Sequence, residues 1–181
     1  MATTALAAAG TAIVLAATVL TSAPAEAQTT NSSARVISAQ GQLRDLQLST
    51  AGPFDHARAS VVMIQRRGRT LAILHVRGID RAAAGKDFGA HLHVGPCVTG
   101  DGAAAGSHYN ADTAAGRVPP RVSPTTEIWL DFVVSEAGTG FAITGVPFVP
   151  GPGNRAIVIH QEPTNPQGAA GPRQACLSVS W

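Results

Sequence analysis

From residue 34 onward, short segments in which apolar and polar residues alternate are separated by glycine and proline. Alternation with a period of two is typical of β-strands that bury one face, while glycine and proline are common in the turns between strands. We therefore predict eight strands, at residues 34–40, 43–49, 57–65, 70–78, 127–134, 140–149, 155–161 and 176–180.

The spacing of these segments indicates how the strands pair. Parallel strands need long crossovers, and no helical segment of about 10–15 residues separates one predicted strand from the next, so we predict an all-β domain, an antiparallel sandwich or barrel. Residues 63–74 are typical of a hairpin with Gly68 at its turn, and only residues 80–88 could form a helical turn. Residues 94–126 and 161–175 contain no strand pattern at all, and loops of that length in a small domain are usually functional.

The N-terminus has a different composition. Residues 4–20 form a continuous apolar run, followed by small residues at Ala25 and Ala27, a pattern typical of a cleaved secretory signal. A retained membrane anchor is the alternative, but it needs about 20 apolar residues, more than this run provides. We expect residues 1–27 to be a signal peptide, residues 28–34 a disordered lead-in and residues 35–181 the β domain of a protein that is secreted or held in the periplasm or cell envelope.

The charge of the chain excludes one class of partner. It carries 13 basic and 11 acidic side chains, a net charge of +2, whereas nucleic-acid binding needs a strong excess of basic residues. The basic cluster at residues 65–69 fits the tip of a short hairpin. We predict no nucleic-acid partner and no membrane contact apart from the signal peptide, and the sequence leaves the oligomeric state open.

Cys97 and Cys176 are the only cysteines of the chain. Nothing keeps thiols reduced outside the cytoplasm, so this pair predicts one disulfide in an exported protein. Such a bridge closes a loop of nearly 80 residues, for which the chain-entropy treatment gives about 4–5 kcal/mol of stabilisation.

Histidines are concentrated in the segment between residues 89 and 110. In a strand, His91 and His93 lie on one face, about 6.6–6.8 Å apart along the chain, while Leu92 points the other way into the core. Such a pair is by itself a weak indication of a metal site. His108 follows in a loop rich in glycine and alanine, where a structural histidine would have few neighbours to pack against.

A fourth histidine, His160, ends the predicted strand at residues 155–161. Four neutral imidazoles suit copper, which stands at the top of the divalent affinity order and accepts tetragonal nitrogen sites. A structural zinc site would more often include cysteine or carboxylate. His56, in a turn segment, and His75, on a strand, fit no such group, and we expect them to be ordinary surface or strand residues.

Four segments resemble, in order along the chain, motifs of the copper/zinc superoxide dismutases. They match the paired copper histidines, the loop of the bridging histidine, the last copper-histidine strand and the catalytic-arginine segment with its cysteine: GAHLHVGPC, AGSHYN, RAIVIHQE and AAGPRQAC. The similarity extends from about Ala57 to Cys176, most of the chain after the predicted signal peptide.

This resemblance implies a Greek-key β-sandwich, or flattened barrel, with the metal site on its outside beneath the two long loops. Copper would be bound by four histidines, namely His91, His93, His108 and His160. Arg173 would hold the superoxide anion beside the metal, the bridging residue His108 would carry a proton, and Cys97 would be bridged to Cys176.

The chain departs from the family at the zinc site. No histidine lies between His108 and His160, and the acidic residues there are a poor substitute for a zinc site, so we predict a copper-only centre without zinc. The outer nitrogen of His108 then needs another partner, because metal-bound imidazoles nearly always have one. Glu127 or Asp131 is our hypothesis for that partner, although the alternating pattern of residues 127–134 would equally place both on a solvent-facing strand surface.

A second departure lies between His160 and Arg173, where the segment is short and Glu162 is its single charge. The family usually carries a longer charged loop there, so we expect a more open site. The predicted activity is conversion of superoxide to dioxygen and hydrogen peroxide. The alternative is a non-catalytic copper protein for storage or delivery, and Arg173 favours the enzyme because a copper store needs no anion-binding arginine.

Overall fold

The computed structural model describes residues 1–3 and 33–181. The chain divides into two units, Met1–Asn31 and Ser32–Trp181, and the fold described below is that of the second. Residues 4–27 of the predicted signal peptide and most of the predicted lead-in lie outside the described residues. Ser33 and Ala34 are exposed and precede the first strand. None of the helices among the described residues has the length and apolar character needed to cross a bilayer.

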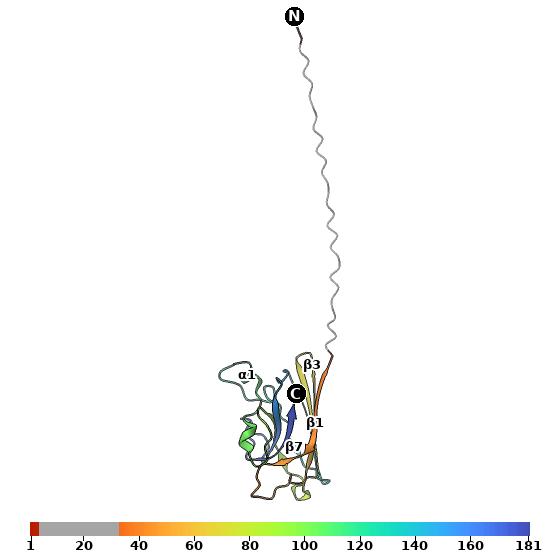
Figure 1. The fold of residues 1–181 in the computed structure, drawn as a ribbon, viewed down its shortest axis with the longest axis vertical. Coiled ribbons are helices and arrows are strands. Elements are labelled where there is room, and N and C mark those ends of the chain that lie inside the picture. Colours follow the sequence, from red (N-terminus) through yellow and green to blue (C-terminus); the bar gives the residue numbers. More distant parts are fainter. Residues whose placement is uncertain (4–32) are drawn as a thin grey trace. The chain divides into compact units, whose positions relative to one another are not determined.

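Two four-stranded sheets form the domain (Figure 1). Sheet A has the order β1-β3-β4-β8 and consists of β1 (Arg35–Gln42), β3 (Arg58–Arg66), β4 (Arg69–Arg77) and β8 (Thr139–Val146). Sheet B has the order β2-β10-β9-β6 and consists of β2 (Arg44–Asp45), β6 (Ala90–His93), β9 (Asn154–His160) and β10 (Arg173–Ser180). The remaining elements are short: η1 (Arg81–Ala83), β5 (Asp87–Phe88), η2 (Gly102–Ala105), α1 (Ala111–Ala114) and β7 (Phe132–Val133).

All strand pairs are antiparallel, and several neighbours are distant in sequence. β4 pairs with β8 and β6 pairs with β9, so the chain crosses from one sheet to the other, as in a Greek key. The predicted fold class, an antiparallel Greek-key sandwich, is confirmed.

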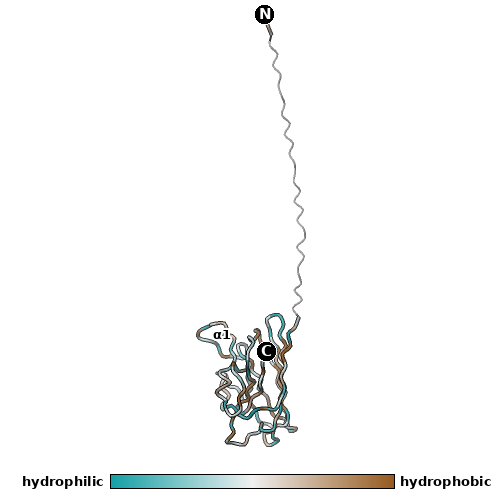
Figure 2. The backbone as a smooth tube through the Cα atoms, viewed as in Figure 1, coloured by the Kyte–Doolittle hydropathy of each residue, from teal (hydrophilic) through white to brown (hydrophobic). Residues whose placement is uncertain are grey.

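The core lies between the two sheets, because each contributes its alternate residues to one apolar cluster. Met63 and Leu74 from sheet A and Leu92 and Ile157 from sheet B are completely buried there. Burying a side chain of this size contributes about 1.5–3 kcal/mol relative to leaving it in water. Figure 2 shows hydrophobic residues along the strands of the domain, and those that point between the sheets hold the two layers together.

The hairpin predicted at residues 63–74 is confirmed. β3 and β4 are joined at the pair Arg66 and Arg69, and the two residues between them both have positive φ, 50° at Arg67 and 73° at Gly68. Such a two-residue turn matches the twist of the flanking strands, and glycine favours its second position. The helical turn expected within residues 80–88 is also present, as η1.

Two strand predictions are wrong in extent. Residues 43–49 form only the two-residue strand β2, because the Asp45 carboxylate accepts a hydrogen bond from the backbone N–H of Gln47 at 2.7 Å and starts a turn. Residues 127–134 form only β7, preceded by isolated bridges that pair Trp129 with His91 and Glu127 with Asn110. Residues 128–134 still alternate between buried and more exposed positions, although only two of them pair in a ladder, whereas in residues 43–49 Leu43 and Leu46 are buried and Leu48 is exposed.

The two long loops cover the outward face of sheet B. η2 contacts β9 and β10, and in Figure 1 it is the green helical turn beside the blue strands. A second apolar cluster lies under it and includes Ala105, Ala156 and Val158. The segment after β9 is fixed to the start of β6 by a hydrogen bond from Gly89 N–H to Glu162 O.

Candidate metal centre

The four predicted metal histidines meet on the outward face of sheet B. His91 and His93 come from β6 and His160 from the end of β9, and β6 pairs directly with β9. Leu92, between His91 and His93, and Ile159, directly before His160, point the opposite way into the core. One ligand atom from each of these histidines and from His108 lies within 4.8 Å of all the others.

Hydrogen bonds define the tautomers of His93 and His160. In each ring Nδ1 lies 3.1 Å from a backbone carbonyl oxygen, that of Gly106 for His93 and that of Gly171 for His160. A carbonyl can only accept, so Nδ1 carries the hydrogen and Nε2 keeps a free lone pair. The two Nε2 atoms lie 3.2 Å apart. Two lone pairs facing each other at this distance need a cation between them, and two ligands at about 2.0–2.1 Å from one ion are spaced in this way.

In His91 the hydrogen-bonded nitrogen is Nε2 and not Nδ1. The Thr164 hydroxyl donates to Asp131 Oδ1 at 2.8 Å, so it accepts from His91 Nε2, which lies 2.7 Å away. Nδ1 of His91 is therefore the atom with the lone pair. It is buried and has no hydrogen-bond partner among the described residues. An unpartnered buried nitrogen beside two other lone pairs is suited to bind a metal ion together with them.

His108 is held by a carboxylate. Its Nδ1 donates to Glu127 Oε2 at 2.9 Å, which leaves Nε2 for the point shared by the other three rings. Glu127 also accepts from Trp129 Nε1 at 2.9 Å and from Asn110 Nδ2 at 3.0 Å. Burial acts to raise the pKa of Glu127, but the three hydrogen bonds outweigh it and hold the pKa below its usual value.

All four rings thus present one lone pair to a common point while the opposite nitrogen is fixed by an acceptor. Metal-bound histidines show this arrangement almost without exception. The donor set contains no thiolate and no carboxylate within the group. The four histidines therefore fit a metal ion, and their chemistry suits one that prefers imidazole nitrogen.

Burial keeps the rings neutral. Desolvation is the main cause that lowers the pKa of His93 to about 2 and that of His160 to about 4, and it lowers the pKa of His91 as well. The neighbouring imidazoles add to the effect, since a proton on one ring repels a proton on the next. Neutral imidazole is the form that binds a metal, so the site is ready for an ion at neutral pH.

Arg173 lies at the start of β10 and closes one side of the group. Its guanidinium donates to the carbonyl oxygens of Gly102 and Gly106, the second at 2.6 Å. Gly106 O also accepts from His93, so one carbonyl positions both side chains. Gly106 has φ of 67°, and a Cβ there would lie 2.8 Å from Val94, so this turn needs glycine. Arg173 and His108 line the same surface depression.

The predicted disulfide is confirmed. Cys97 and Cys176 are bonded, with their Cα atoms 5.6 Å apart, and both are buried. The bond ties the loop that follows β6 to the middle of β10, so it connects the segment of His91 and His93 with the strand that carries Arg173. A disulfide of this kind indicates an oxidising compartment outside the cytoplasm.

Three residues beside the site were not identified from the sequence. Thr164 holds His91, and Asn110 and Trp129 hold the carboxylate of Glu127. Thr164 and Asn110 lie in loops where no periodic pattern marks them, and the alternation of residues 127–134 does not reveal that the indole N–H of Trp129 bonds Glu127. His56, in an exposed turn, and His75, exposed on sheet A, lie outside the histidine group, as expected.

Comparisons with known proteins agree with this architecture. A scan against protein-family models and a search of curated proteins find no match for the chain. Among solved structures, the clock protein EA4 superposes with a TM-score of 0.55 at 18% identity, over 83% of this chain and 96% of that one. A double mutant of a SOD-like protein from Bacillus subtilis gives 0.52 at 18% identity, over 78% of this chain and 97% of that one.

At this identity the likeness establishes the fold and not the activity. The chain has the β-sandwich fold of a SOD-like protein, and a group of four histidines that could bind a metal ion lies within that fold.

Proposed function

We propose that the protein is an extracytoplasmic, copper-dependent superoxide dismutase that works without zinc. The observation that carries the proposal is the convergence of four imidazole lone pairs beside the guanidinium of Arg173. Bound copper would supply the redox chemistry, oxidising one superoxide to dioxygen and reducing the next, with two protons, to hydrogen peroxide.

Copper is favoured by the donor set. The group offers four neutral nitrogens and no thiolate, which suits copper better than a structural zinc. In the family that the sequence resembles, zinc occupies the outer nitrogen of the bridging histidine. Here the equivalent nitrogen, His108 Nδ1, is already bonded to Glu127, and this supports a single-metal centre.

The residues of the chain have distinct tasks in this proposal. Arg173 attracts and orients the superoxide anion, since a guanidinium is permanently charged and presents several donors to a small anion. His108 would take up a proton on Nε2 when that atom is not bound to the metal, with its ring held by Glu127 through Nδ1. The surface depression lined by both residues admits the anion, and the buried rings of His91 and His93 stay shielded from water.

The protein purified from an exporting host is expected to contain about one copper per chain and to remove superoxide. Arg173→Ala should keep its copper and lose roughly 10- to 100-fold in superoxide removal, because one charged donor to the reacting anion is lost. Arg173→Lys, which keeps the charge but not the fork of donors, should lie between the two. Metal analysis and a superoxide-removal assay test both points.

Two results would contradict the proposal. Copper bound at full occupancy without superoxide removal would indicate a storage or delivery protein on the same fold. Zinc bound in preference to copper would remove the redox chemistry altogether.

We further propose that Glu127 positions His108 and that Asp131 positions His91 through Thr164. Glu127→Gln should weaken copper binding and lower turnover by about 10- to 100-fold, because the amide is a weaker acceptor for the His108 N–H. Asp131→Asn should have a smaller effect, because its carboxylate lies 3.7 Å from His91 Nε2 and reaches that ring mainly through the Thr164 hydroxyl.

The measurement is a copper titration of the metal-free protein together with the absorption spectrum of the copper-loaded form. The matched control is Glu136→Gln, an exposed carboxylate that makes no contact with the four histidines. Unchanged copper affinity and spectrum in Glu127→Gln would show that this carboxylate serves only the fold.

A further inference from the structure

The outward face of sheet A is apolar at its centre. Its outward residues alternate with those of the core, and seven of them are aliphatic or aromatic: Val36, Val62, Ile64, Leu71, Ile73, Phe141 and Ile143. The strand register joins six of them into two rows, Val36 with Ile64 and Leu71, and Val62 with Ile73 and Ile143, while Phe141 lies beside His75. Val36, Phe141 and Ile143 are 62%, 61% and 57% exposed, and a contiguous apolar patch of this kind indicates a binding surface.

Arginines flank the patch at both ends. Four are gathered at the β3–β4 turn and two at the opposite end of the same strands, all exposed: Arg35, Arg66, Arg67 and Arg69, then Arg58 and Arg77. The four strands of sheet A and this turn contain no aspartate or glutamate. Among the described residues, none of the six arginines takes part in an ion pair.

This charge distribution argues against a second copy of the chain as the partner. Two copies packed face to face would bring only arginines together, since the face carries charge of one sign. Like charges placed opposite each other across an interface oppose association. A soluble polyanion would satisfy the arginines but would leave the rows of Val, Ile, Leu and Phe in water.

An anionic lipid bilayer offers both kinds of contact, because it has negatively charged headgroups above an apolar interior. We propose that the outward face of sheet A docks on such a bilayer, with Phe141 and Ile143 entering the headgroup region and the arginines pairing with lipid phosphates. Apolar side chains at the centre and basic ones at the margin are the features of interfacial membrane binding. Arginine is well suited to the margin because its fork of donors matches phosphate geometry.

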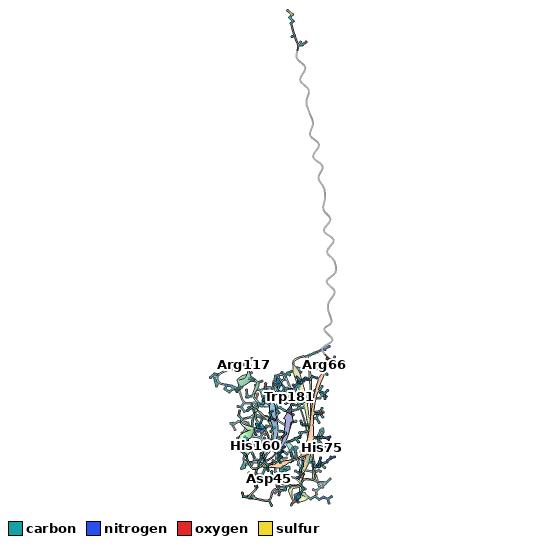
Figure 3. The ribbon with its side chains drawn as sticks, viewed as in Figure 1. Asp45, Arg66, His75, Arg117, His160 and Trp181 are labelled. Atoms are coloured by element: carbon teal, nitrogen blue, oxygen red, sulfur yellow. A yellow bond between two sulfur atoms is a disulfide. The ribbon has the colours of Figure 1, made fainter. Side chains whose placement is uncertain are left out.

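The docked orientation leaves the metal centre accessible. The four histidines lie on the outward face of sheet B, and the core separates that face from the outward face of sheet A. In Figure 3, Arg66 and His75 of sheet A lie on one side of the domain and His160 lies toward the other. The sequence alone predicted no membrane contact after loss of the signal peptide, because a net charge of +2 does not reveal that Arg58, Arg66, Arg69 and Arg77 share one face.

The test uses the protein as it is exported, with the intact mass checked so that every variant carries the same N-terminus. Sedimentation with vesicles of phosphatidylcholine and phosphatidylglycerol in equal parts should pull down the wild type, and vesicles of phosphatidylcholine alone should not. Arg66→Gln/Arg67→Gln/Arg69→Gln should lower the partition coefficient roughly 100-fold, since each basic residue at an anionic surface contributes about fivefold. Phe141→Asn/Ile143→Thr should also lower it, by at least tenfold.

The matched control removes three positive charges elsewhere, with Arg81→Gln/Lys86→Gln/Arg117→Gln, and should bind the vesicles within about threefold of the wild type. Equal losses in the control and in the sheet A variant would overturn the proposal, because attraction would then depend on net charge alone. The proposal would also be overturned if the protein bound dextran sulfate as strongly as it binds vesicles and if Phe141→Asn/Ile143→Thr did not weaken that binding. A dimer in solution that this apolar variant dissociates would likewise overturn it and assign the face to a second copy. Copper loading plays no part in these measurements, so they stand apart from the proposed activity.

Discussion

Removal of the disulfide by Cys97→Ala/Cys176→Ala is expected to lower the free energy of unfolding by about 4–5 kcal/mol. The bond joins residues that are 79 positions apart, so its loss frees a loop of more than half the described domain in the unfolded chain. A domain of this size typically has a net stability of about 5–15 kcal/mol, and the loss is a large part of it. Urea unfolding of the metal-free protein, followed by circular dichroism, measures the change.

The bond also has a local effect at the site. Cys97 belongs to the loop that carries Gly102 and Gly106, whose carbonyls position Arg173 and His93. With the bond broken, we expect this loop to open more readily and copper affinity to fall along with stability. Wild-type protein whose disulfide is chemically reduced is the control, because it keeps both sulfur atoms in place. A stability change below about 1 kcal/mol in both samples would show that packing alone fixes the loop.

The fold could be predicted because its signal is repeated. Residues 57–65 and 70–78 are rich in Val, Ile and Leu and meet at a glycine turn, and the structure makes them β3 and β4 with every second residue in the core. The same rule failed at residues 43–49, where a single hydrogen bond from Gln47 N–H to Asp45 ends the strand. A local side-chain contact of this kind is not visible in an apolar pattern.

The candidate site was predictable only as a set of residue types. The histidines stand out in the sequence because His91 and His93 share a strand face and His160 ends another strand. Their meeting depends on the pairing of β6 with β9, which joins segments more than 60 residues apart. The choice between Glu127 and Asp131 was left open in the sequence, and the contacts separate them: Glu127 bonds His108 directly, whereas Asp131 reaches His91 mainly through Thr164.

Lowering the pH is expected to destabilise the metal-free protein strongly. His93 and His160 have pKa values of about 2 and about 4 in the folded chain, against 6.5 for a free imidazole, and burial is the main cause. At a pH between the folded pKa values and 6.5, the unfolded chain binds more protons than the folded one. The contribution of these rings to the free energy of unfolding is therefore complete above pH 6.5 and is lost as the pH falls. Each such ring contributes about 1.4 kcal/mol per pH unit, and two or three rings together give a loss on the order of 5 kcal/mol between pH 6.5 and 4.5.

Chemical unfolding of the metal-free protein at a series of pH values measures this dependence. Replacing one ring, with His93→Asn, should reduce the slope below pH 6.5 by about one proton, whatever it does to the stability at neutral pH. His75→Asn, at an exposed position on sheet A, should leave the slope unchanged. Copper should shift the loss of stability to lower pH, because an ion held by the same nitrogens competes with protons for them. Stability that stays constant from pH 6.5 to 4.5 in the metal-free protein would mean that the rings accept protons inside the fold, and the convergence of four free lone pairs would then be wrong.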